Sequence, residues 1–292
     1  MRSALPLLAF TASLLCAPVA MALNEYGIEG MGVVSTRADE GRASVAADGQ
    51  SIVWASTREG VGKGWNLWRA RLIDGRWQQP QPLPLNSSGD DIDPYFSHDG
   101  RWLLFASDRD GAMALYRAPV SAEGALGEPE RLPAAEPTRN AVSERAPALS
   151  RDGRWLLSVR EPGRGQPAQV WVSTLQGGRR GQAQPLPALG GDDGVDGADW
   201  LGTDGALVFT RGTAGQRQLW TSACAWSGEA TQPLALSFNT AQGRTLAPVV
   251  DAAKPSELLL VSSSARAPRA GGLDVYRMLA PQPRAAQPCR PG

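Results

Sequence analysis

The chain has 292 residues, and its 29 lysines and arginines balance 29 aspartates and glutamates. This balance excludes the strong positive field by which nucleic-acid-binding and membrane-surface proteins attract their partners, so we expect no nucleic-acid partner. With one histidine and three cysteines, the chain has few side chains for a metal site or a catalytic triad.

Residues 1–22 have the pattern of a secretory signal peptide. They contain one early arginine, an apolar middle and the small-residue cleavage site A-M-A. No other run approaches the ~20 apolar residues of a membrane span. We therefore expect an exported, periplasmic protein without a membrane span. Cys16 raises the alternative of a lipoprotein, but Leu15 stands where that processing site needs a small residue.

A pattern of short strands returns five times after this leader. In its clearest copy, residues 93–118, an Asp99-Gly100 pair predicts a tight hairpin, and residues 102–107 form an apolar second strand. Related copies occupy residues 43–58, 145–160, 197–211 and 246–266, and the last copy lacks the Asp-Gly turn. The turn aspartates Asp48, Asp99, Asp152 and Asp204 are 51, 53 and 52 residues apart.

Each copy continues into a third strand that carries one aromatic residue: Trp68, Tyr116, Trp171, Trp220 and Tyr276. Weaker fourth strands follow four copies as short proline-containing segments such as P-Q-P-L-P. A period of about 50 residues with four strands per unit is the signature of a β-propeller blade. The sequence therefore predicts an all-β chain, with one propeller domain over residues 23–280 and a proline-rich tail over residues 281–292.

The unit P-x-F-S-x-D-G-R-W-L-x-F-x-S-D-R, followed by L-Y-R, resembles the blade repeat of the TolB-like propellers. Residues 93–117 match that repeat almost fully and residues 145–159 match it well, and the copies together cover nearly the whole chain after residue 22. The resemblance extends to the propeller alone and implies protein–protein contacts in the cell envelope. Peptidase propellers and relatives of sugar lyases carry the same unit, so it predicts the blade better than the function.

The two ends of the chain determine how the ring closes. The fifth unit ends at residues 274–278, and the segment after it is too rich in proline to supply a fourth strand. Residues 30–35 precede the first unit and can fill that place, so an N-terminal strand would close a five-bladed ring. A six-bladed ring with one degenerate blade is the alternative.

Two cysteines remain after cleavage of the leader. Cys224 follows the third strand of unit four, and Cys289 lies in the tail after unit five, its neighbour in the ring. An exported chain permits a disulfide. We expect a bridge between them, worth ~4 kcal/mol in the chain-entropy model, and two unpaired thiols are the alternative.

No catalytic, cofactor or metal motif stands out. The sole histidine, His98, lies in a hairpin turn, and the motif G-x-S-x-G is absent. The acidic runs 90–93 and 192–196 look a little like calcium loops but lack the spacing of a known one. We expect no catalytic residues, no cofactor and no bound metal.

One polar pattern recurs along the units. Five residues before the end of the first strand, four units have a carboxylate and the fifth has Thr245; the carboxylates are Glu40, Asp91, Glu144 and Asp196. An arginine leaves the second strand of every unit, two positions earlier in units three and four: Arg58, Arg109, Arg160, Arg211 and Arg266. Both sets are predicted to lie at one mouth of the channel. They would form either a polar funnel for a ligand or ion pairs that fasten blade to blade.

These observations predict a monomeric, non-catalytic propeller scaffold of the periplasm that binds an envelope protein or peptide at its charged mouth. One alternative is a propeller lyase or hydrolase that acts on a glycan, and another is a receptor for a small ligand or ion. Trp65, Trp77 and Trp226 fall outside the repeat register. They would either pack between blades or offer a stacking surface to a sugar or a partner.

Overall fold

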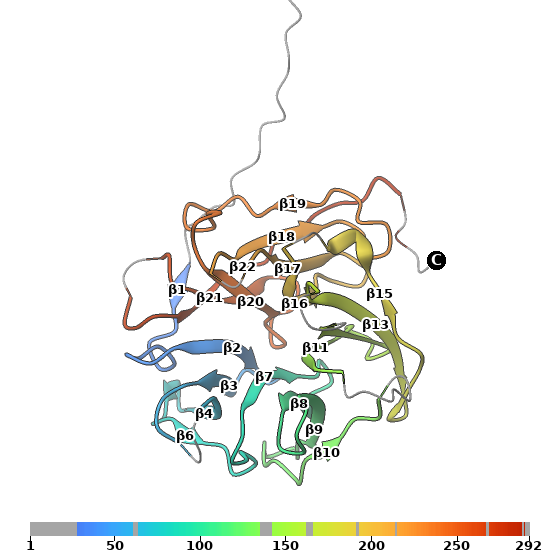
Figure 1. Cartoon of the computed structure of the whole chain (residues 1–292). Helices are drawn as coiled ribbons and strands as arrows, with labels where there is room; N and C mark the ends of the chain where they lie inside the picture. The colour runs from blue at the N-terminus through green and yellow to red at the C-terminus, as the bar shows by residue number, and fades with distance from the viewer. Residues whose placement is uncertain are drawn as a thin grey trace, which may run out of the picture.

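The computed structural model describes residues 28–60, 64–134, 142–161, 166–190, 193–213, 215–266, 269–287 and 289. Five antiparallel sheets surround a central axis (Figure 1), which confirms the predicted all-β, five-bladed propeller. The predicted leader, residues 1–22, lies outside the described residues. Within the described part of the chain, no helix has both the length and the apolar character needed to cross a membrane.

Each blade consists of three long strands and a short fourth strand. The inner strands are β2 (Glu40–Val45), β7 (Asp91–Phe96), β11 (Glu144–Leu149), β16 (Val195–Trp200) and β20 (Thr245–Val250). The second strands are β3 (Ser51–Ser56), β8 (Trp102–Ser107), β12 (Trp155–Arg160), β17 (Leu207–Arg211) and β21 (Leu258–Ser263). The third strands are β4 (Asn66–Ile73), β9 (Ala114–Pro119), β13 (Gln169–Gln176), β18 (Gln218–Ser222) and β22 (Asp274–Leu279). The fourth strands are β6 (Gln81–Pro82), β10 (Glu130–Arg131), β15 (Gln184–Pro185), β19 (Gln232–Pro233) and β1 (Glu29–Gly30).

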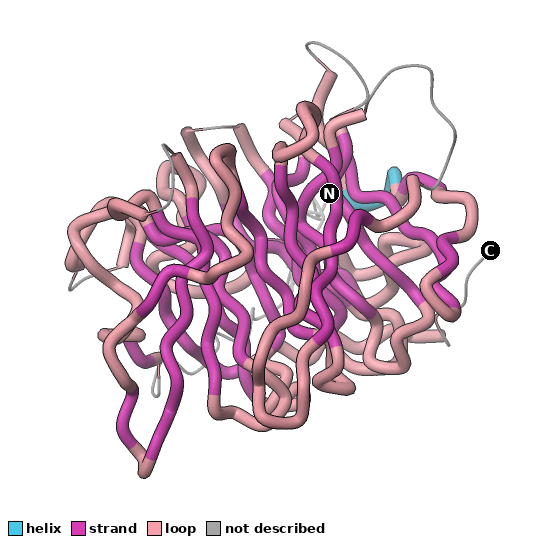
Figure 2. Tube along the Cα trace, turned by 90° about the horizontal axis from the view of Figure 1, so that it is seen from below, coloured by secondary structure: helices cyan, strands magenta, loops and turns pink. Residues whose placement is uncertain are grey.

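We number the blades 1 to 5 by their inner strands in chain order. Blades 1 and 3 have eight-residue third strands, which continue into short outer hairpins with β5 (Arg76–Trp77) and β14 (Arg179–Arg180). A single 3-10 turn, η1 (Pro187–Leu189), follows β15. The strands run across the thickness of the disc, and loops gather at both ends of them (Figure 2). The molecule therefore has two distinct loop faces.

The hairpins between first and second strands form one of these faces. Gly49, Gly100, Gly153 and Gly205 have φ values of 70°, 70°, 69° and 85°, a backbone region that glycine enters without steric cost. The aspartate before each of the first three glycines accepts a hydrogen bond from the backbone two residues on. Blade 5 has Ala253 where these blades have the turn aspartate, and its turn runs longer, from Asp251 to Leu258; there the Ala253 N–H donates to Asp251.

Every inner strand contains a β-bulge near its start. In blade 1, for example, Glu40 lies opposite Ser56 and Val45 lies opposite Ile52, so six inner residues face five outer ones. The other four blades have the same count. A bulge changes the direction in which the next side chains point, and this repeated bulge therefore determines which residues face the channel.

The hydrophobic core lies within and between the blades. The second strands are buried on both faces, as the apolar run at residues 102–107 predicts. The largest apolar cluster contains residues of blades 2, 3, 4 and 5, and a smaller one joins the inner strand of blade 1 to blade 5. Because each blade buries its faces only against its neighbours, the ring stabilises all blades together.

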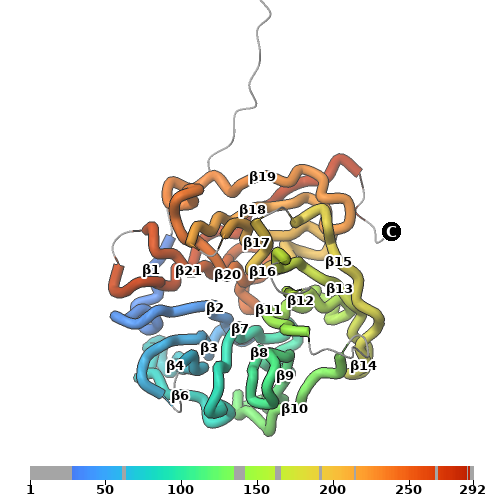
Figure 3. The backbone as a smooth tube through the Cα atoms, viewed as in Figure 1, coloured from blue at the N-terminus to red at the C-terminus, as the bar shows by residue number. Residues whose placement is uncertain are grey.

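The first and last described strands share one sheet (Figure 3). β1 runs antiparallel to β22, with Glu29 opposite Arg277 and Gly30 opposite Tyr276, and the Met31 N–H donates to the Val275 carbonyl. The paired segment is shorter than the predicted strand over residues 30–35, because the chain turns after Met31: the N–H groups of residues 34 and 35 donate back to its carbonyl. That this pairing keeps the ring closed remains a prediction.

The tail crosses the adjacent blade. Cys224 and Cys289 form a disulfide in the structure. Gly205 lies against this bridge, and a Cβ at that position would come within 2.7 Å of the Cys289 sulfur. The Ala286 N–H also donates to the carboxylate of Glu229.

Candidate functional site: the channel mouth

The predicted carboxylate register holds in three blades and not in the fourth. Glu40, Asp91 and Glu144 each begin an inner strand and lie opposite the last residue of the second strand. Strand pairing puts Val195 at this place in blade 4, because Val195 lies opposite Arg211. Asp196 comes one residue later and points away from that register, so its predicted place in the column was wrong. Successive residues of a strand face opposite sides.

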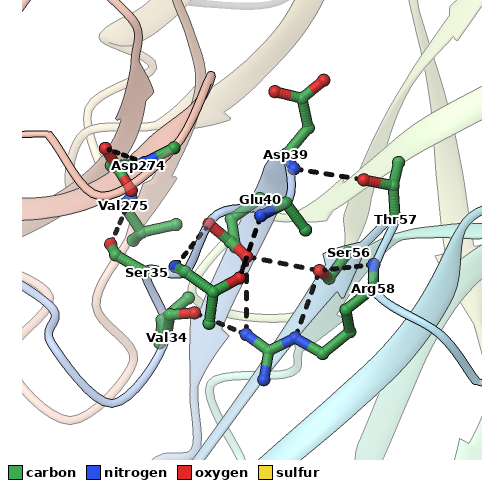
Figure 4. Close-up of polar contacts among 12 residues, drawn as sticks. Val34, Ser35, Asp39, Glu40, Ser56, Thr57, Arg58, Asp274 and Val275 are labelled. Carbon is green, nitrogen blue, oxygen red and sulfur yellow. Dashed lines mark hydrogen bonds and ion pairs between the residues drawn. The ribbon is translucent and has the colours of Figure 1, made fainter.

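Glu40 is fully buried inside blade 1 (Figure 4). It accepts hydrogen bonds from the Thr36 N–H (3.0 Å) and hydroxyl (2.6 Å), from the Ser56 hydroxyl (3.3 Å) and from Arg58 Nη2 (3.4 Å). Burial raises the pKa of Glu40, and the Thr36 hydrogen bonds and the Arg58 charge offset this effect only in part. Arg58 has a second anchor, the Val34 carbonyl at 2.6 Å.

Asp91 repeats this arrangement in blade 2. Its carboxylate accepts from the Ser87 N–H (2.5 Å) and hydroxyl (2.9 Å) and from Arg109 Nη2 (2.7 Å). Arg109 also donates to the Leu85 carbonyl at 2.9 Å and to the Ser107 hydroxyl. In both blades the ion pair ties the start of the inner strand to the connection that leads into it.

Glu144 in blade 3 has more cationic partners. It accepts from Arg160 Nε at 2.8 Å, from Arg180 Nη1 and Nη2 at 2.7 and 2.6 Å, and from the Ser158 hydroxyl at 2.6 Å. Burial opposes its ionisation, but the hydrogen bonds and charge of Arg180, together with Arg160, lower the pKa of Glu144 to about 2. Sequence reasoning missed Arg180, which comes from the outer hairpin strand β14. Blade 1 has the matching strand β5, and Trp77 takes the place of Arg180 there.

The five predicted arginines share a different partner, the aromatic residue of the third strand in the same blade. Each guanidinium carbon lies 4.8–5.7 Å from that ring centroid, at Trp68, Tyr116, Trp171, Trp220 and Tyr276 in chain order. Arg160 and Arg211 stand two positions earlier in their units than the other three arginines, yet each stacks on the third-strand aromatic residue of its own blade. Stacking of this kind contributes about 0.5–2 kcal/mol per pair, depending on exposure. The arginines are therefore held inside their own blades.

None of Glu40, Asp91, Glu144 or the five arginines lines the hollow at the channel mouth. That hollow has a volume of about 280 Å³, and we call it the funnel. Among the predicted site residues, only Asp196 lines it. Its wall consists of Gly41, Arg42, Ala55, Trp65, Asp90, Ile92, Asp93, Arg145, Asp196, Arg244, Leu246, Ala247 and Leu273.

Three of the bulges place a charged residue in the funnel wall, namely Arg42, Asp93 and Asp196. Asp93, Ala146 and Ala247 occupy the bulge with φ values of 53–55°, and Arg42 stands at the same position in blade 1. Non-glycine residues rarely adopt positive φ, and such backbone concentrates at functional sites and bulges. The sequence offered a signal for this site, since charged residues at a bulged inner strand cannot point into an apolar blade.

A half-buried ion-pair network lies at the funnel. Arg145 Nη2 pairs with Asp196, and Arg145 Nη1 lies 3.9 Å from Asp93. Arg217 Nε lies 3.5 Å from the other oxygen of Asp196. Burial alone would raise the pKa of Asp196, but the charges of Arg145 and Arg217 hold it below its usual value. Burial raises the pKa of Asp93 despite the opposing charges of Arg145 and Arg42.

Two other funnel arginines keep unused donors. Arg42 is only 2% exposed, and its Nε and Nη1 have no hydrogen-bond partner; Nη2 makes one long contact, 3.4 Å to the Ala198 carbonyl. The buried Nε of Arg244 also lacks a partner. A buried donor without a partner costs about 1–3 kcal/mol, and more when it is charged. These donors therefore favour an acceptor that enters the funnel.

Below Arg42, side chains and backbone from the remaining four blades meet at the axis. The Tyr95 hydroxyl lies 2.9 Å from the Leu149 carbonyl and 3.3 Å from Asp199, and Asp199 accepts from the Val250 N–H at 2.7 Å. Burial raises the pKa of Asp199 to about 7 against the opposing charge of Arg42. This cluster forms the floor beneath the funnel.

His98 lies on the other side of this floor. Its Nε2 is 3.2 Å from the Tyr95 hydroxyl, and burial lowers the pKa of the ring. The ring is half-buried although it lies in a hairpin turn. The reason is its contact with Tyr95, which lies three residues earlier on the inner strand of the same blade.

The acidic loops bind backbone in the described part of the chain. Asp90 accepts from the Trp65 N–H at 2.8 Å, while its own N–H donates to Asp108 at 2.8 Å. Asp192 lies outside the described residues. Among the residues that are described, no three histidine, cysteine or acidic side chains form a group that could hold a metal ion.

No protein-family model matches the chain. Solved structures share its fold at low identity: putative TolB from Agrobacterium tumefaciens is 16% identical with a TM-score of 0.54, over 87% of this chain and 97% of that one. A thermostable family-43 glycoside hydrolase is 12% identical with a TM-score of 0.54, over 88% and 97%. TolB from Acinetobacter baumannii is 17% identical with a TM-score of 0.47 over 66% of this chain, which spans 42% of that protein's length. The first two similarities support the propeller fold, and they leave the function open.

Proposed function

We propose that this protein is a non-catalytic binding propeller of the cell envelope, whose funnel receives an acidic group of a protein or peptide partner. The observation that carries the proposal is the buried Arg42 guanidinium, which lines the funnel with two nitrogens free of any partner. A hydrogen bond from a cation to a carboxylate is about twice as strong as a neutral one. A partner carboxylate therefore satisfies the donors that the fold leaves open.

The envelope location rests on the predicted leader at residues 1–22 and on the disulfide. Disulfides persist in oxidising compartments such as the periplasm, and Cys224 is paired with Cys289. In this proposal the buried pairs of Glu40, Asp91 and Glu144 hold the blades in shape. Asp196 is the member of the predicted set that lines the funnel, where its ion pairs with Arg145 and Arg217 offset its own charge.

The proposal is tested by capture from envelope extract with purified protein, followed by competition with acidic and amidated peptides. Arg244→Gln removes a funnel guanidinium that is not part of the floor, and we expect it to weaken capture about tenfold, the loss of one charged hydrogen bond. Arg266→Gln is the matched control, since Arg266 stacks on Phe238 and Tyr276 outside the funnel. Equal capture by wild type and Arg244→Gln, or a loss confined to Arg266→Gln, would contradict the proposal.

A glycan hydrolase is the second candidate, and one observation favours it. Asp93 and Asp196 both face the funnel, and their pKa values move in opposite directions, as in an acid and base pair. Arg145 contacts both carboxylates, which ties them to each other. Incubation with a panel of oligosaccharides, followed by mass spectrometry, decides between the two functions. Cleavage that disappears in Asp93→Asn would establish the enzyme, and no cleavage would leave the binding role.

A further inference from the structure

The hairpin face carries a groove that the funnel does not reach. Three hollows of about 560, 160 and 350 Å³ follow one another along this face, and Arg151 lines all three. The first and second also share Asp152, and the second and third share Asp204. The funnel lies at one end of the inner strands and this face at the other. Five steps of about 3.4 Å along a six-residue strand put the two about 17 Å apart. The groove is therefore a separate surface.

Three tryptophans form the middle hollow. The rings of Trp155 and Trp226 are arranged edge to face, with their centroids 5.2 Å apart. The ring centroid of Trp200 lies 6.0 Å from that of Trp226. Trp155 and Trp226 are half-buried, so part of each indole remains open to the hollow. Trp226 is one of the tryptophans outside the repeat register, so the repeat by itself does not place a third tryptophan at the equivalent position of the other blades.

An unused donor points to a ligand in this hollow. Trp200 is 4% exposed and lines the hollow, yet its buried indole N–H has no hydrogen-bond partner. The rim provides charged and hydroxyl groups from Arg151, Asp152, Thr203 and Asp204. The middle hollow thus combines open aromatic surface, one buried donor and a polar rim.

The disulfide completes the wall. Cys289 lines the middle hollow, and the tail residues 281–284 line the third one. The bridge to Cys224 holds the tail against the hairpin of blade 4, where Gly205 leaves room for the sulfur. The Ala286 N–H, which donates to Glu229, and the Gln282 side chain, which donates to the Ser256 carbonyl, hold the tail in the same place, so the bridge and these hydrogen bonds together position the wall of the third hollow.

We propose that this groove binds a linear oligosaccharide of pyranose rings, with one ring on the tryptophans of the middle hollow. A pyranose has an apolar C–H face that packs on an indole and a rim of hydroxyl groups that need donors and acceptors. The middle hollow holds about ten water-sized spheres, comparable to the non-hydrogen atoms of one sugar ring. Extended peptides pair with an exposed strand edge, and this face presents hairpin turns instead.

The test is titration of ¹⁵N-labelled full-length mature protein with chitotetraose, cellotetraose and tetragalacturonate, observed at the indole N–H signals. We expect at least one sugar to shift the Trp200 and Trp226 signals and to leave the Trp65 signal of the funnel unchanged. Comparison of the neutral sugars, chitotetraose and cellotetraose, with the acidic tetragalacturonate shows which kind of pyranose the groove prefers. Trp226→Ala should weaken binding about tenfold, whereas Trp65→Ala should not change it.

A second groove variant keeps the test decisive. Trp226→Ala can disturb Trp155 and Trp200, so Arg151→Ala serves as a second groove variant; the Arg151 guanidinium donates to the Ser256 hydroxyl. A weaker affinity of Arg151→Ala for the same sugar supports the groove. No indole shift with any of the three sugars at 10 mM, shifts confined to Trp65, or shifts produced only by an acidic peptide would each overturn the inference.

Discussion

Blades 1 and 3 have a glutamate at the same buried position but surround it with different partners. Glu40 has one arginine partner at 3.4 Å, and its other contacts come from hydroxyl and backbone groups. Glu144 has two arginine partners at 2.8 and 2.6 Å. The pKa of Glu40 is raised by burial, whereas the charges around Glu144 lower its pKa to about 2.

The comparison teaches that burial and partner number, rather than position in the repeat, decide what a buried carboxylate does. Removing a charge from water costs several kcal/mol, and only close, well-directed partners recover that cost. Arg58 divides its donors between Glu40 and the Val34 carbonyl, while the side chain of Arg180 is 1% exposed and gives two nitrogens to Glu144.

The largest expected effect comes from deleting the N-terminal segment whose Thr36 donates to Glu40. Glu40 has these hydrogen bonds in place of a second arginine. Deletion of residues 28–36 removes strand β1, the Thr36 donors and the buried side chains of Met31 and Val34. Two buried apolar side chains and the lost hydrogen bonds amount to about 5 kcal/mol, which is near the whole stability of a domain. Thermal unfolding should show a large fall in Tm, and Thr36→Ala alone should cost about 1 kcal/mol. An unchanged Tm in the deletion variant would refute closure by the N-terminal strand.

Next in size is Glu144→Gln, which leaves Arg160 and Arg180 without their anion. Breaking a buried ion pair in this way costs about 3–5 kcal/mol. Urea unfolding at pH 7 measures the free energy of unfolding, with the exposed neighbour Glu161→Gln as control at less than about 0.5 kcal/mol. A cost below about 1 kcal/mol for Glu144→Gln would show that the two arginines do not depend on it.

A smaller effect is expected from Glu40→Gln at the same pH. The amide keeps one acceptor oxygen for Thr36 and Ser56, and Arg58 retains its carbonyl partner and its stacking on Trp68. The cost should be about 1–2 kcal/mol, from the hydrogen bond that the amide nitrogen cannot accept. If both glutamine variants lose equal stability in urea, the contrast between the two blades fails.

The finest test uses pH, because the two glutamates should give slopes of opposite sign. Glu144 has a lowered pKa, so its contribution is complete above about pH 4.5 and is lost as pH falls toward 2, a change of ~3 kcal/mol. Glu40 has a raised pKa, so the folded state holds its proton more tightly, and stability falls as pH rises above 4.5. The difference in unfolding free energy between wild type and each glutamine variant, followed from pH 2 to 8, isolates each group. Slopes of equal sign would contradict the assignment.

The fold was largely predictable, because it rests on features that recur. The Asp-Gly turns, the apolar second strands and the aromatic third strands gave the blade number, and the structure confirms five. The arginine column was also visible in the sequence, but its partners were not. In each blade the arginine stacks on the aromatic residue of the third strand. The arginine pattern and the aromatic pattern of the sequence therefore form one contact per blade.

The candidate site was predictable only in part. The register placed Glu40, Asp91 and Glu144 correctly at the start of inner strands, yet they lie inside the blades. The predicted column included Asp196, but strand pairing puts Val195, one residue earlier, at that position. A shift of one residue reverses the face on which a strand side chain lies. The same alternation brings Asp196 into the funnel, beside Arg145.

The sequence by itself determined the repeat, the strand order and the residues able to carry charge, since these depend on local pattern and on turns. Only the tertiary structure decided that Arg42, Asp199 and Tyr95 meet at the axis and that Arg180 reaches Glu144. Arg42 and Asp199 are 157 positions apart in the sequence and come from different blades. Contacts across the axis depend on the closure of the ring and on the bulges that turn side chains inward, and neither is a property of any one repeat.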